Sequence, residues 1–379
     1  MKLLIKRSSL LFLLVILAIF ACKSEAENSK YNPNEFTLLI AASNDGEVGP
    51  CGWKSNPLGG LARKHTILKG LAEKQATFFV DAGDAFFKHP YVVDSQREQL
   101  IGTASAILKA YNEMGCRVLN VGSHDLAAGK AFVLELEKQA KFPFISANIL
   151  DAESKQTLFG PSLIIETPGR TLGFVGVSSG DQKLKEFEFS DPVEAANKAI
   201  AKIKDNVDLV FLLANVDDKT QKLLTQEVKD VDFLIRSNSG SVQRNPKEEN
   251  GVVVISIGKQ GKYAGALRVT NVDKFSSLKN VSPQYTRINF SDNRLLAMSK
   301  GLEEGKTLEE HYADDEKRLQ LISRLRDERQ TNVDLIKSLK NTYYLEAIAL
   351  NEKVEDAPEV ASIVADYMPK ENESKASHK

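Results

Sequence analysis

Two hydrophobic patterns alternate along the chain between residues 36 and 290. Short continuous apolar runs bounded by polar turns are typical of buried strands, whereas an apolar residue every three or four positions is typical of an amphipathic helix. Strands are expected at 36–42, 77–82, 117–121, 143–147, 162–166, 172–177, 208–213, 231–235, 252–257, 263–269 and 285–289. Helices are expected at 60–74, 96–114, 130–139, 192–204 and 219–229. Because the two patterns alternate, the sequence predicts a layered α/β fold.

After Phe290 the pattern changes to a densely charged segment with helical periodicity. Its apolar residues repeat at helical spacing over 319–325 and 333–339, with a wholly polar stretch between. This predicts either one long helix or a helical hairpin within 291–341. Such an element either lies on the globular domain or makes a coiled-coil contact with a protein partner or a second copy, and both alternatives stay open. A strand at 343–350 and a short helix at 358–367 are expected to follow.

The N-terminus has the composition of an export signal. Three basic residues precede the apolar run 10–21, which is too short to span a bilayer as a helix, and Cys22 follows directly. Residues 19–22 are similar to a bacterial lipobox, in which the cysteine is acylated, and the alternatives are a conventional cleaved signal or an uncleaved anchor. The resemblance implies attachment to a lipid bilayer through acylated Cys22, and Lys23 favours the periplasm-facing side of an outer membrane. The polar stretch 22–35 then predicts a flexible tether.

The overall composition is that of an ordinary globular protein. Of the 379 residues, 42% are hydrophobic and 27% are charged, and the formal net charge is −1. A chain without an excess of basic residues has no electrostatic footprint for a nucleic-acid polymer. Cys51 and Cys116 could pair in an exported protein only if their Cα atoms lay close together, and a free or buried thiol is our interpretation of each.

Candidate chemistry begins in the stretch 43–63, where a predicted strand ends in acidic residues, a glycine-rich turn and the start of a helix. Open α/β sheets present their chemistry at such strand ends. Three further motifs follow: Asp-Ala-Gly-Asp ending at Asp84, Gly-Ser-His-Asp at 122–125 and Gly-Lys-Tyr-Ala-Gly at 261–265. Over residues 36–269 the chain resembles the calcineurin-like metallophosphatase domain of 5′-nucleotidases. The stretch with Pro-Cys-Gly and Gly-Gly-Leu-Ala-Arg is most similar to a bacterial lipoprotein branch.

The resemblance implies a role for each position of the metal site. Asp84 keeps the place of the carboxylate that bridges two metal ions, and His124 keeps the place of the histidine that stabilises the leaving group. Ser123 stands where the family has an asparagine ligand, and Asn215 stands where a strand ends in a ligand histidine. Asn238 lies in a block that has lost both of its histidines.

The first ligand position can be aligned in two ways. If the Pro-Cys-Gly match sets the register, Asp45 lies under the family histidine and Ser43 under its aspartate. If Asn44 and Asp45 are matched instead, Asp45 is the aspartate and Glu47 replaces the histidine. The first alignment is preferred because it needs no gap, and both change the type of a ligand.

The number of histidines leads to the same conclusion without an alignment. A two-metal site of this family uses several imidazoles, because neutral nitrogen donors suit transition metals. The chain has only five histidines, of which His124, and less plausibly His89, can lie near the predicted strand ends. The sequence therefore predicts that the dinuclear centre of the family is not formed.

The donors that remain at the expected site are mainly oxygen atoms. Asp45, Asp84, Asn215 and Asn238 are hard ligands that suit a single Mg²⁺ or Ca²⁺, and Mn²⁺ is a further choice. We therefore predict either no cofactor or one divalent cation. For Asn215 and Asn238 a structural role is predicted, while for Asp84 and His124 a structural and a functional role stay open.

The resemblance implies a four-layer fold in which two β-sheets pack face to face and are flanked by helices. The expected organisation is a signal peptide at 1–21, a tether at 22–35, a metallophosphatase-like domain at 36–290 and a charged helical region with a disordered tail at 291–379. The lost ligands favour a membrane-tethered, non-catalytic lipoprotein that acts as a binding or scaffolding module of the cell envelope. The alternative is a 5′-nucleotidase-like, metal-dependent phosphoesterase that uses an altered, oxygen-rich site.

Overall fold

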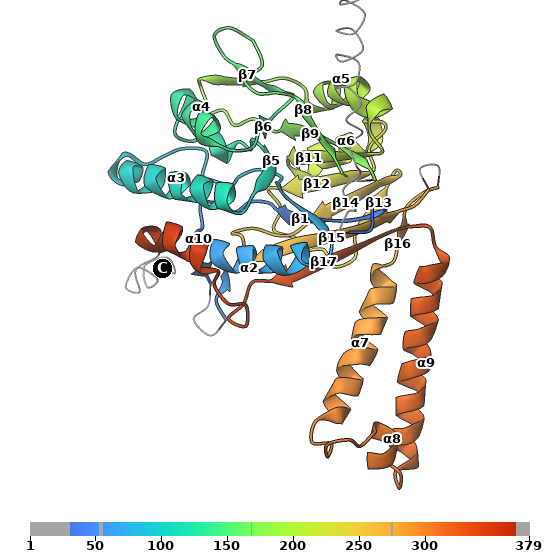
Figure 1. Cartoon of the computed structure of the whole chain (residues 1–379). Helices are drawn as coiled ribbons and strands as arrows, with labels where there is room; N and C mark the ends of the chain where they lie inside the picture. Colours follow the sequence, from blue (N-terminus) through green and yellow to red (C-terminus); the bar gives the residue numbers. More distant parts are fainter. Residues whose placement is uncertain (1–30, 53–55, 168, 274–275, 369–379) are drawn as a thin grey trace, which may run out of the picture.

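Two β-sheets packed face to face form the centre of the molecule, and helices cover the outer face of each sheet (Figure 1). The structure is a computed structural model that describes residues 31–52, 56–167, 169–273 and 276–368. Three apolar clusters separate its layers, one between the sheets and one beneath each helical layer. The predicted four-layer α/β fold is confirmed.

The first sheet has seven strands, and four of its six neighbouring pairs are parallel. In spatial order the strands are β16 (Lys279–Asn280), β17 (Asn341–Ala349), β15 (Tyr263–Asn271), β1 (Glu35–Ala41), β4 (Ala76–Asp81), β5 (Cys116–Asn120) and β6 (Phe144–Ile145). From β1 to β6 the neighbours run parallel, whereas β15 runs antiparallel to both β1 and β17. The helices on its outer face are α2 (Leu61–Ala72), α3 (Arg97–Glu113), α4 (Lys130–Gln139) and α10 (Pro358–Val364).

The second sheet has six strands with a parallel centre. Their spatial order is β13 (Lys247–Glu249), β14 (Val252–Ser256), β12 (Phe233–Ser237), β11 (Leu209–Asn215), β9 (Thr171–Ser178) and β8 (Ser162–Glu166). Only the edge strands β13 and β8 are antiparallel to their neighbours. The helices α5 (Pro192–Ile203) and α6 (Asp218–Glu227) pack on its outer face. Asp191 caps α5 by accepting a 2.8 Å hydrogen bond from the Glu194 N–H group.

Short elements complete the sandwich. Two-stranded sheets pair β2 (Pro50–Cys51) with β3 (Leu58–Gly59) and β7 (Ile149–Asp151) with β10 (Phe187–Phe189). Single 3₁₀ turns are η1 (Asp94–Gln96), η2 (His124–Leu126), η3 (Lys204–Asn206) and η4 (Ala365–Tyr367). Cys51 is half-buried and Cys116 is buried, and both are free thiols, as predicted. None of the helices in the described parts of the chain combines the length and the apolar character of a membrane span.

Aromatic rings fill the space between the two sheets. Phe211 of β11 is fully buried and stacks between Phe174 and Phe233, with ring centroids 5.1 and 5.0 Å away. Phe36 of β1 meets the same ring edge to face at 6.5 Å. Because β1 belongs to the other sheet, this cluster joins the two sheets through buried apolar surface.

The C-terminal region contains a helical hairpin that projects from the sandwich (Figure 1). Its long helices α7 (Ser282–Ser299) and α9 (Glu316–Ser338) pack against each other, and the short α8 (Leu308–His311) lies at the tip. Of the two predicted forms, the structure contains the hairpin and not one continuous helix. Because α7 begins at Ser282, the expected domain boundary at 290 falls inside this helix.

The prediction of a strand at 285–289 is wrong, because these residues lie in α7. Pro283 occupies the first helical turn, where its fixed backbone angle favours a helix start. Tyr285 then stacks on Tyr344 of β17 with ring centroids 4.3 Å apart. Five residues with a short apolar pattern do not distinguish a strand from a helix, and this packing decides for the helix.

After the hairpin the chain returns to the first sheet. The strand expected at 343–350 is β17, which pairs with β15 over its whole length of nine residues. The helix expected at 358–367 is present as α10 followed by η4, and α10 packs against α2 and α3. The charged helical region is therefore confined to the hairpin, and the residues of β17 and α10 belong to the sandwich.

We expect Phe211→Ala to lower the free energy of unfolding by about 3–5 kcal/mol, because the variant leaves a cavity between the sheets. Urea denaturation followed by circular dichroism measures the change. The control is Phe290→Ala, an equal truncation on the hairpin at a residue that is 63% exposed. It should change the free energy of unfolding by less than about 0.5 kcal/mol. Equal losses in the two variants would contradict the assignment of the core.

Candidate metal centre

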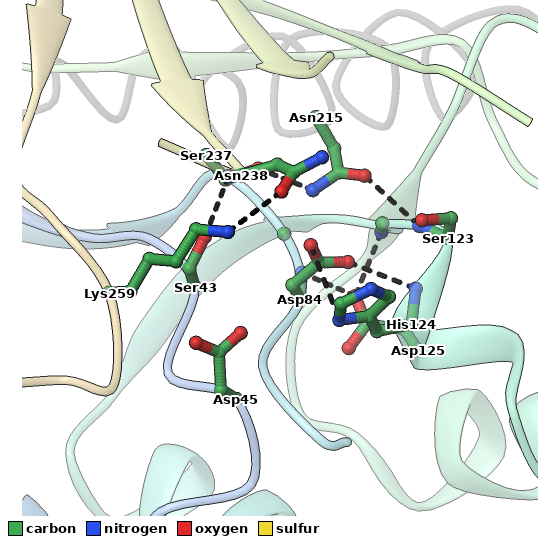
Figure 2. Close-up of polar contacts among 12 residues, drawn as sticks. Ser43, Asp45, Asp84, Ser123, His124, Asp125, Asn215, Ser237, Asn238 and Lys259 are labelled. Carbon is green, nitrogen blue, oxygen red and sulfur yellow. Dashed lines mark hydrogen bonds and ion pairs between the residues drawn. The ribbon is translucent and has the colours of Figure 1, made fainter. Parts of the chain in front are cut away.

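The six site residues expected from the sequence lie at one edge of the sandwich, at the carboxyl ends of parallel strands (Figure 2). They are Asp45 after β1, Asp84 after β4, Ser123 and His124 after β5, Asn215 at the end of β11, and Asn238 after β12. Both sheets therefore contribute to a single site. Cys22, the expected lipidation residue, lies outside the described residues.

Three of these residues converge as possible ligands of one cation. Asp45, Asp84 and His124 each offer one ligand atom, and the three atoms lie within 4.8 Å of one another. Asp84 is only 1% exposed, and its Oδ1 accepts a 3.0 Å hydrogen bond from the His124 backbone N–H group. Its Oδ2 lies 3.7 Å from His124 Nδ1, which is too long for a hydrogen bond.

The polar atoms of this cluster fit a bound cation. Asp84 Oδ2 and His124 Nδ1 are both buried and have no hydrogen-bond partner among the residues that the structure describes. Buried polar atoms without a partner are rare, because each costs free energy of desolvation. A divalent cation would satisfy both atoms, and two carboxylates with one imidazole form a donor set suited to Mn²⁺ and similar ions.

Burial also makes the Asp45 carboxylate costly without a cation. It raises the pKa of Asp45 to about 7, and the nearby charge of Asp84 is the second cause of the increase. The Gln260 N–H group, which donates to Asp45 Oδ2 at 3.3 Å, and the charge of Lys259 oppose this shift of the pKa. The site therefore has two close carboxylates and too little positive charge of its own.

Asp125 holds the loops of the centre together, and the sequence analysis did not single it out. Its buried carboxylate accepts hydrogen bonds from the backbone N–H groups of Asp84, Phe86 and Gly122 at 2.9, 2.9 and 2.8 Å. Burial, followed by the charge of Asp84, raises the pKa of Asp125 well above its usual range. The available signal was its place as the fourth residue of the Gly-Ser-His-Asp motif.

The loops at the centre adopt backbone conformations that are uncommon for side-chain-bearing residues. Asp45, Asp84 and Asn238 have φ angles of 55°, 60° and 56°, in the left-handed region that Asp and Asn tolerate better than most residues. Only glycine fits at position 122, because a Cβ atom there would lie 2.3 Å from Asp84 Oδ1. Conformations of this kind cluster at functional sites.

The side chain of Asn215 connects the two sheets. Its Oδ1 accepts a hydrogen bond from the Ser123 backbone N–H group at 3.1 Å, and its Nδ2 donates to Ser237 Oγ at 2.7 Å. Ser237 Oγ in turn donates to the Ala82 carbonyl at 2.8 Å. Both ends of the Asn215 amide are thus used in hydrogen bonds within the protein.

Asn238 lies beside Asn215, because their strands β12 and β11 are neighbours, and its polar groups are also engaged within the protein. Its backbone N–H group donates to Ser43 Oγ at 2.7 Å, and its Oδ1 accepts from Lys259 Nζ at 3.1 Å (Figure 2). Lys259 is a residue of this centre that was not predicted from the sequence. Among the described residues, the cluster around Asp45 does not include Glu47, the alternative first ligand. It does not include His89 either, and the His89 ring stacks on Tyr91 with ring centroids 5.5 Å apart.

Sequence comparison connects this site with known phosphoesterases. The mouse 5′-nucleotidase is 25% identical over 247 residues, which are 57% of this chain and 42% of that protein. A Yersinia enterocolitica protein named 2′,3′-cyclic-nucleotide 2′-phosphodiesterase/3′-nucleotidase is 32% identical over 112 residues, covering 29% of this chain and 17% of that protein. No protein-family model matches the chain.

Solved structures show the same fold. A 5′-nucleotidase precursor from Thermus thermophilus aligns with a TM-score of 0.61 at 17% identity, over 88% of this chain and 58% of that one. A calcineurin-like phosphoesterase from Bacillus subtilis aligns with a TM-score of 0.52 at 22% identity, over 62% of this chain and 84% of that one.

The chain spans about half the length, or less, of the first curated relatives that it matches, including 51% of a Vibrio parahaemolyticus 5′-nucleotidase. In sequence this chain is similar to 5′-nucleotidases, and its fold is that of the calcineurin-like metallophosphatases.

Proposed function

We propose that this protein is a non-catalytic binding module that holds one divalent cation between Asp45, Asp84 and His124. One observation carries the proposal. The amides of Asn215 and Asn238, which stand where a second ion would need ligands, both have their side-chain oxygens in hydrogen bonds within the protein. Two-metal hydrolysis needs a pair of closely spaced ions to activate water and to hold the phosphoryl oxygens. A single cation retains the ability to bind a phosphate group without that pair.

The bound cation would be Mg²⁺, Ca²⁺ or Mn²⁺. Asp45 and Asp84 supply oxygen donors, which all three ions accept, and the His124 imidazole favours Mn²⁺ among them. Asp125 would keep the cluster in place, because it ties the Asp84 loop to the loop that carries His124. The role of the cation is to neutralise the two carboxylates and to attract a ligand oxygen.

A metal-dependent phosphoesterase with an altered site is the second candidate function. The names of the relatives favour it, as does the convergence of Asp84 and His124, since both keep family positions. A single ion can polarise a phosphoryl oxygen, and the protein would then need another group to activate water. The two candidates differ in turnover, which can be measured directly.

The cellular setting is also part of the proposal. The lipobox-like sequence supports anchoring through acylated Cys22 at the cell envelope, facing the periplasm. The projecting α7–α9 hairpin supports contact with a protein partner or with a second copy of the chain. A tethered binding module with a projecting arm would suit a scaffolding role.

We expect the purified chain to bind one Mn²⁺ per molecule in isothermal titration calorimetry. Asp84→Asn should weaken binding by about 100-fold or more, because it removes the buried carboxylate charge at the centre of the cluster. The control is Asp232→Asn, which changes another carboxylate that accepts a backbone hydrogen bond, from Val210 at 2.8 Å, before β12 begins. Equal affinity in Asp84→Asn and the unchanged protein would refute the site.

Binding of Mn²⁺ should also depend on pH through Asp45. Its pKa of about 7 means that a proton competes with the cation below neutrality. Affinity should therefore rise with pH by up to about tenfold per unit from pH 5.5 to 7 and level off above about pH 8. Titrations across this range measure the slope, and Asp45→Asn should flatten it. A slope that Asp45→Asn leaves unchanged would assign the competing proton to another group.

The non-catalytic assignment predicts no metal-dependent turnover of nucleoside monophosphates, cyclic nucleotides or p-nitrophenyl phosphate with Mn²⁺, Zn²⁺, Co²⁺ or Ca²⁺. Product formation, measured as inorganic phosphate from the monoesters and as nucleoside monophosphate from the cyclic nucleotides, should be the same for the unchanged protein, Asp84→Asn and His124→Ala. Turnover that requires both residues would establish the phosphoesterase instead, because a contaminating enzyme would not respond to either substitution.

A further inference from the structure

Lys259 lies on the loop between β14 and β15 that closes one side of the metal centre. Gly258 and Gln260 flank it with φ angles of 82° and 61°, so the loop turns sharply on both sides of the lysine. The next N–H group along the chain, that of Gln260, donates to Asp45 Oδ2 at 3.3 Å. The same loop therefore contacts Asp45 through its backbone and Asn238 through the Lys259 ammonium.

The centre has two unlike parts. Figure 2 shows the Lys259 ammonium at one edge, directed toward Asn238 and near Ser43, with Asp84 and His124 farther along the centre. Asp84 carries a buried oxygen that has no hydrogen-bond partner among the described residues, which fits a cation. Asn238 and Ser43 contribute a neutral amide and a neutral hydroxyl, and Lys259 adds a positive charge beside them.

We propose that Lys259 is a phosphate-binding residue, and that a phosphate group binds between its ammonium and a divalent cation held by Asp45, Asp84 and His124. This inference rests on the cation site of the proposed function. It assigns the class of ligand, a phosphate or a phosphate monoester, and it assigns the residue that makes the centre attractive to an anion.

The charges of the centre explain why both partners are needed. The carboxylates of Asp45 and Asp84 cancel the charge of a divalent cation bound between them, so the cation and these two ligands together carry no net positive charge. The ammonium of Lys259 adds the one positive charge that attracts an anion. An ammonium has three N–H donors, and Asn238 Oδ1 accepts from one of them, so further donors can meet phosphate oxygens.

The same charge has the opposite effect on the cation. Lys259 directly precedes Gln260, whose N–H group donates to Asp45 Oδ2, so its ammonium also disfavours a cation bound at Asp45. Removing the ammonium should therefore strengthen binding of the cation and weaken binding of the phosphate. A substitution that merely disordered the loop would weaken both, because Gln260 would release Asp45.

The experiment compares the full chain with Lys259→Met, using calorimetric titration of Mn²⁺ and then of inorganic phosphate at saturating Mn²⁺. Lys259→Met should bind phosphate about tenfold or more weakly, as expected for loss of a charge-assisted hydrogen bond. It should bind Mn²⁺ as tightly as the unchanged protein or several-fold more tightly. Lys259→Arg should retain phosphate binding within about threefold of the unchanged protein.

The matched control is Lys262→Met, which removes one positive charge from the same loop. Lys262 Nζ donates to Gln260 Oε1 at 2.7 Å, and its charge acts on Glu47 and Cys51. This variant should keep phosphate binding within about threefold of the unchanged protein, because its side chain contacts neither Asn238 nor the cluster. An equal loss of phosphate affinity in Lys262→Met and Lys259→Met would show that any positive charge on the loop has the same effect, and it would overturn the proposal.

The remaining outcomes separate this inference from the proposed function. If the unchanged protein binds no Mn²⁺, the cation site itself fails and the inference falls with it. If the protein binds Mn²⁺ but Lys259→Met leaves the phosphate affinity unchanged, or if no phosphate binds at all, only the role of Lys259 is overturned. Parallel losses of Mn²⁺ and phosphate affinity in Lys259→Met would assign a structural role to the lysine and would also overturn the inference.

Discussion

Burial of apolar surface between the two β-sheets is the constraint on which the candidate centre depends. The Phe211 ring of one sheet is packed against Phe36 of the other, and this contact sets how the strand ends of both sheets meet. Hydrogen bonds across the sheets then complete the edge, from Ser123 to Asn215 and from Asn238 to Ser43. The centre is therefore a property of the interface, and neither sheet alone would form it.

This edge is held in a costly arrangement. Asp45 and Asp84 adopt left-handed backbone conformations, and Asp125 is a fully buried carboxylate. Three backbone N–H groups donate hydrogen bonds to the Asp125 carboxylate, which thereby connects the two loops. Asp84 Oδ2 has no such hydrogen bond within the described protein, and its contrast with the compensated Asp125 indicates that a ligand supplies the missing partner.

The sequence predicted those parts of the structure that follow from local patterns. Hydrophobic periodicity located the core strands and the helices α2 to α6. It succeeds there because each buried position of a strand or helix has to be apolar. It failed at 285–289, where stacking of Tyr285 on Tyr344 favours a helix, and it did not foresee that β17 returns to the sheet beside β15. Both depend on contacts between residues far apart in the chain.

The candidate site shows the same limit at the level of side chains. Motif positions identified Asp45, Asp84 and His124, since strand ends converge wherever parallel strands lie side by side. The direction of an amide is not encoded in a motif, so the cross-sheet hydrogen bonds of Asn215 became visible only in three dimensions. Lys259 was missed because a lysine in a glycine-rich loop is ordinary in sequence, and only its contact with Asn238 relates it to the site.

The position of Lys259 also bears on what kind of protein uses this centre. A catalyst that relies on two ions would be hindered by an ammonium beside Asn238, because the fixed positive charge repels a second cation. A protein that only has to retain a phosphate group benefits from the same ammonium, which is covalently attached and cannot be lost as an ion can. The neutral amides of Asn215 and Asn238 and the lysine that contacts Asn238 thus both support the proposed binding role over hydrolysis.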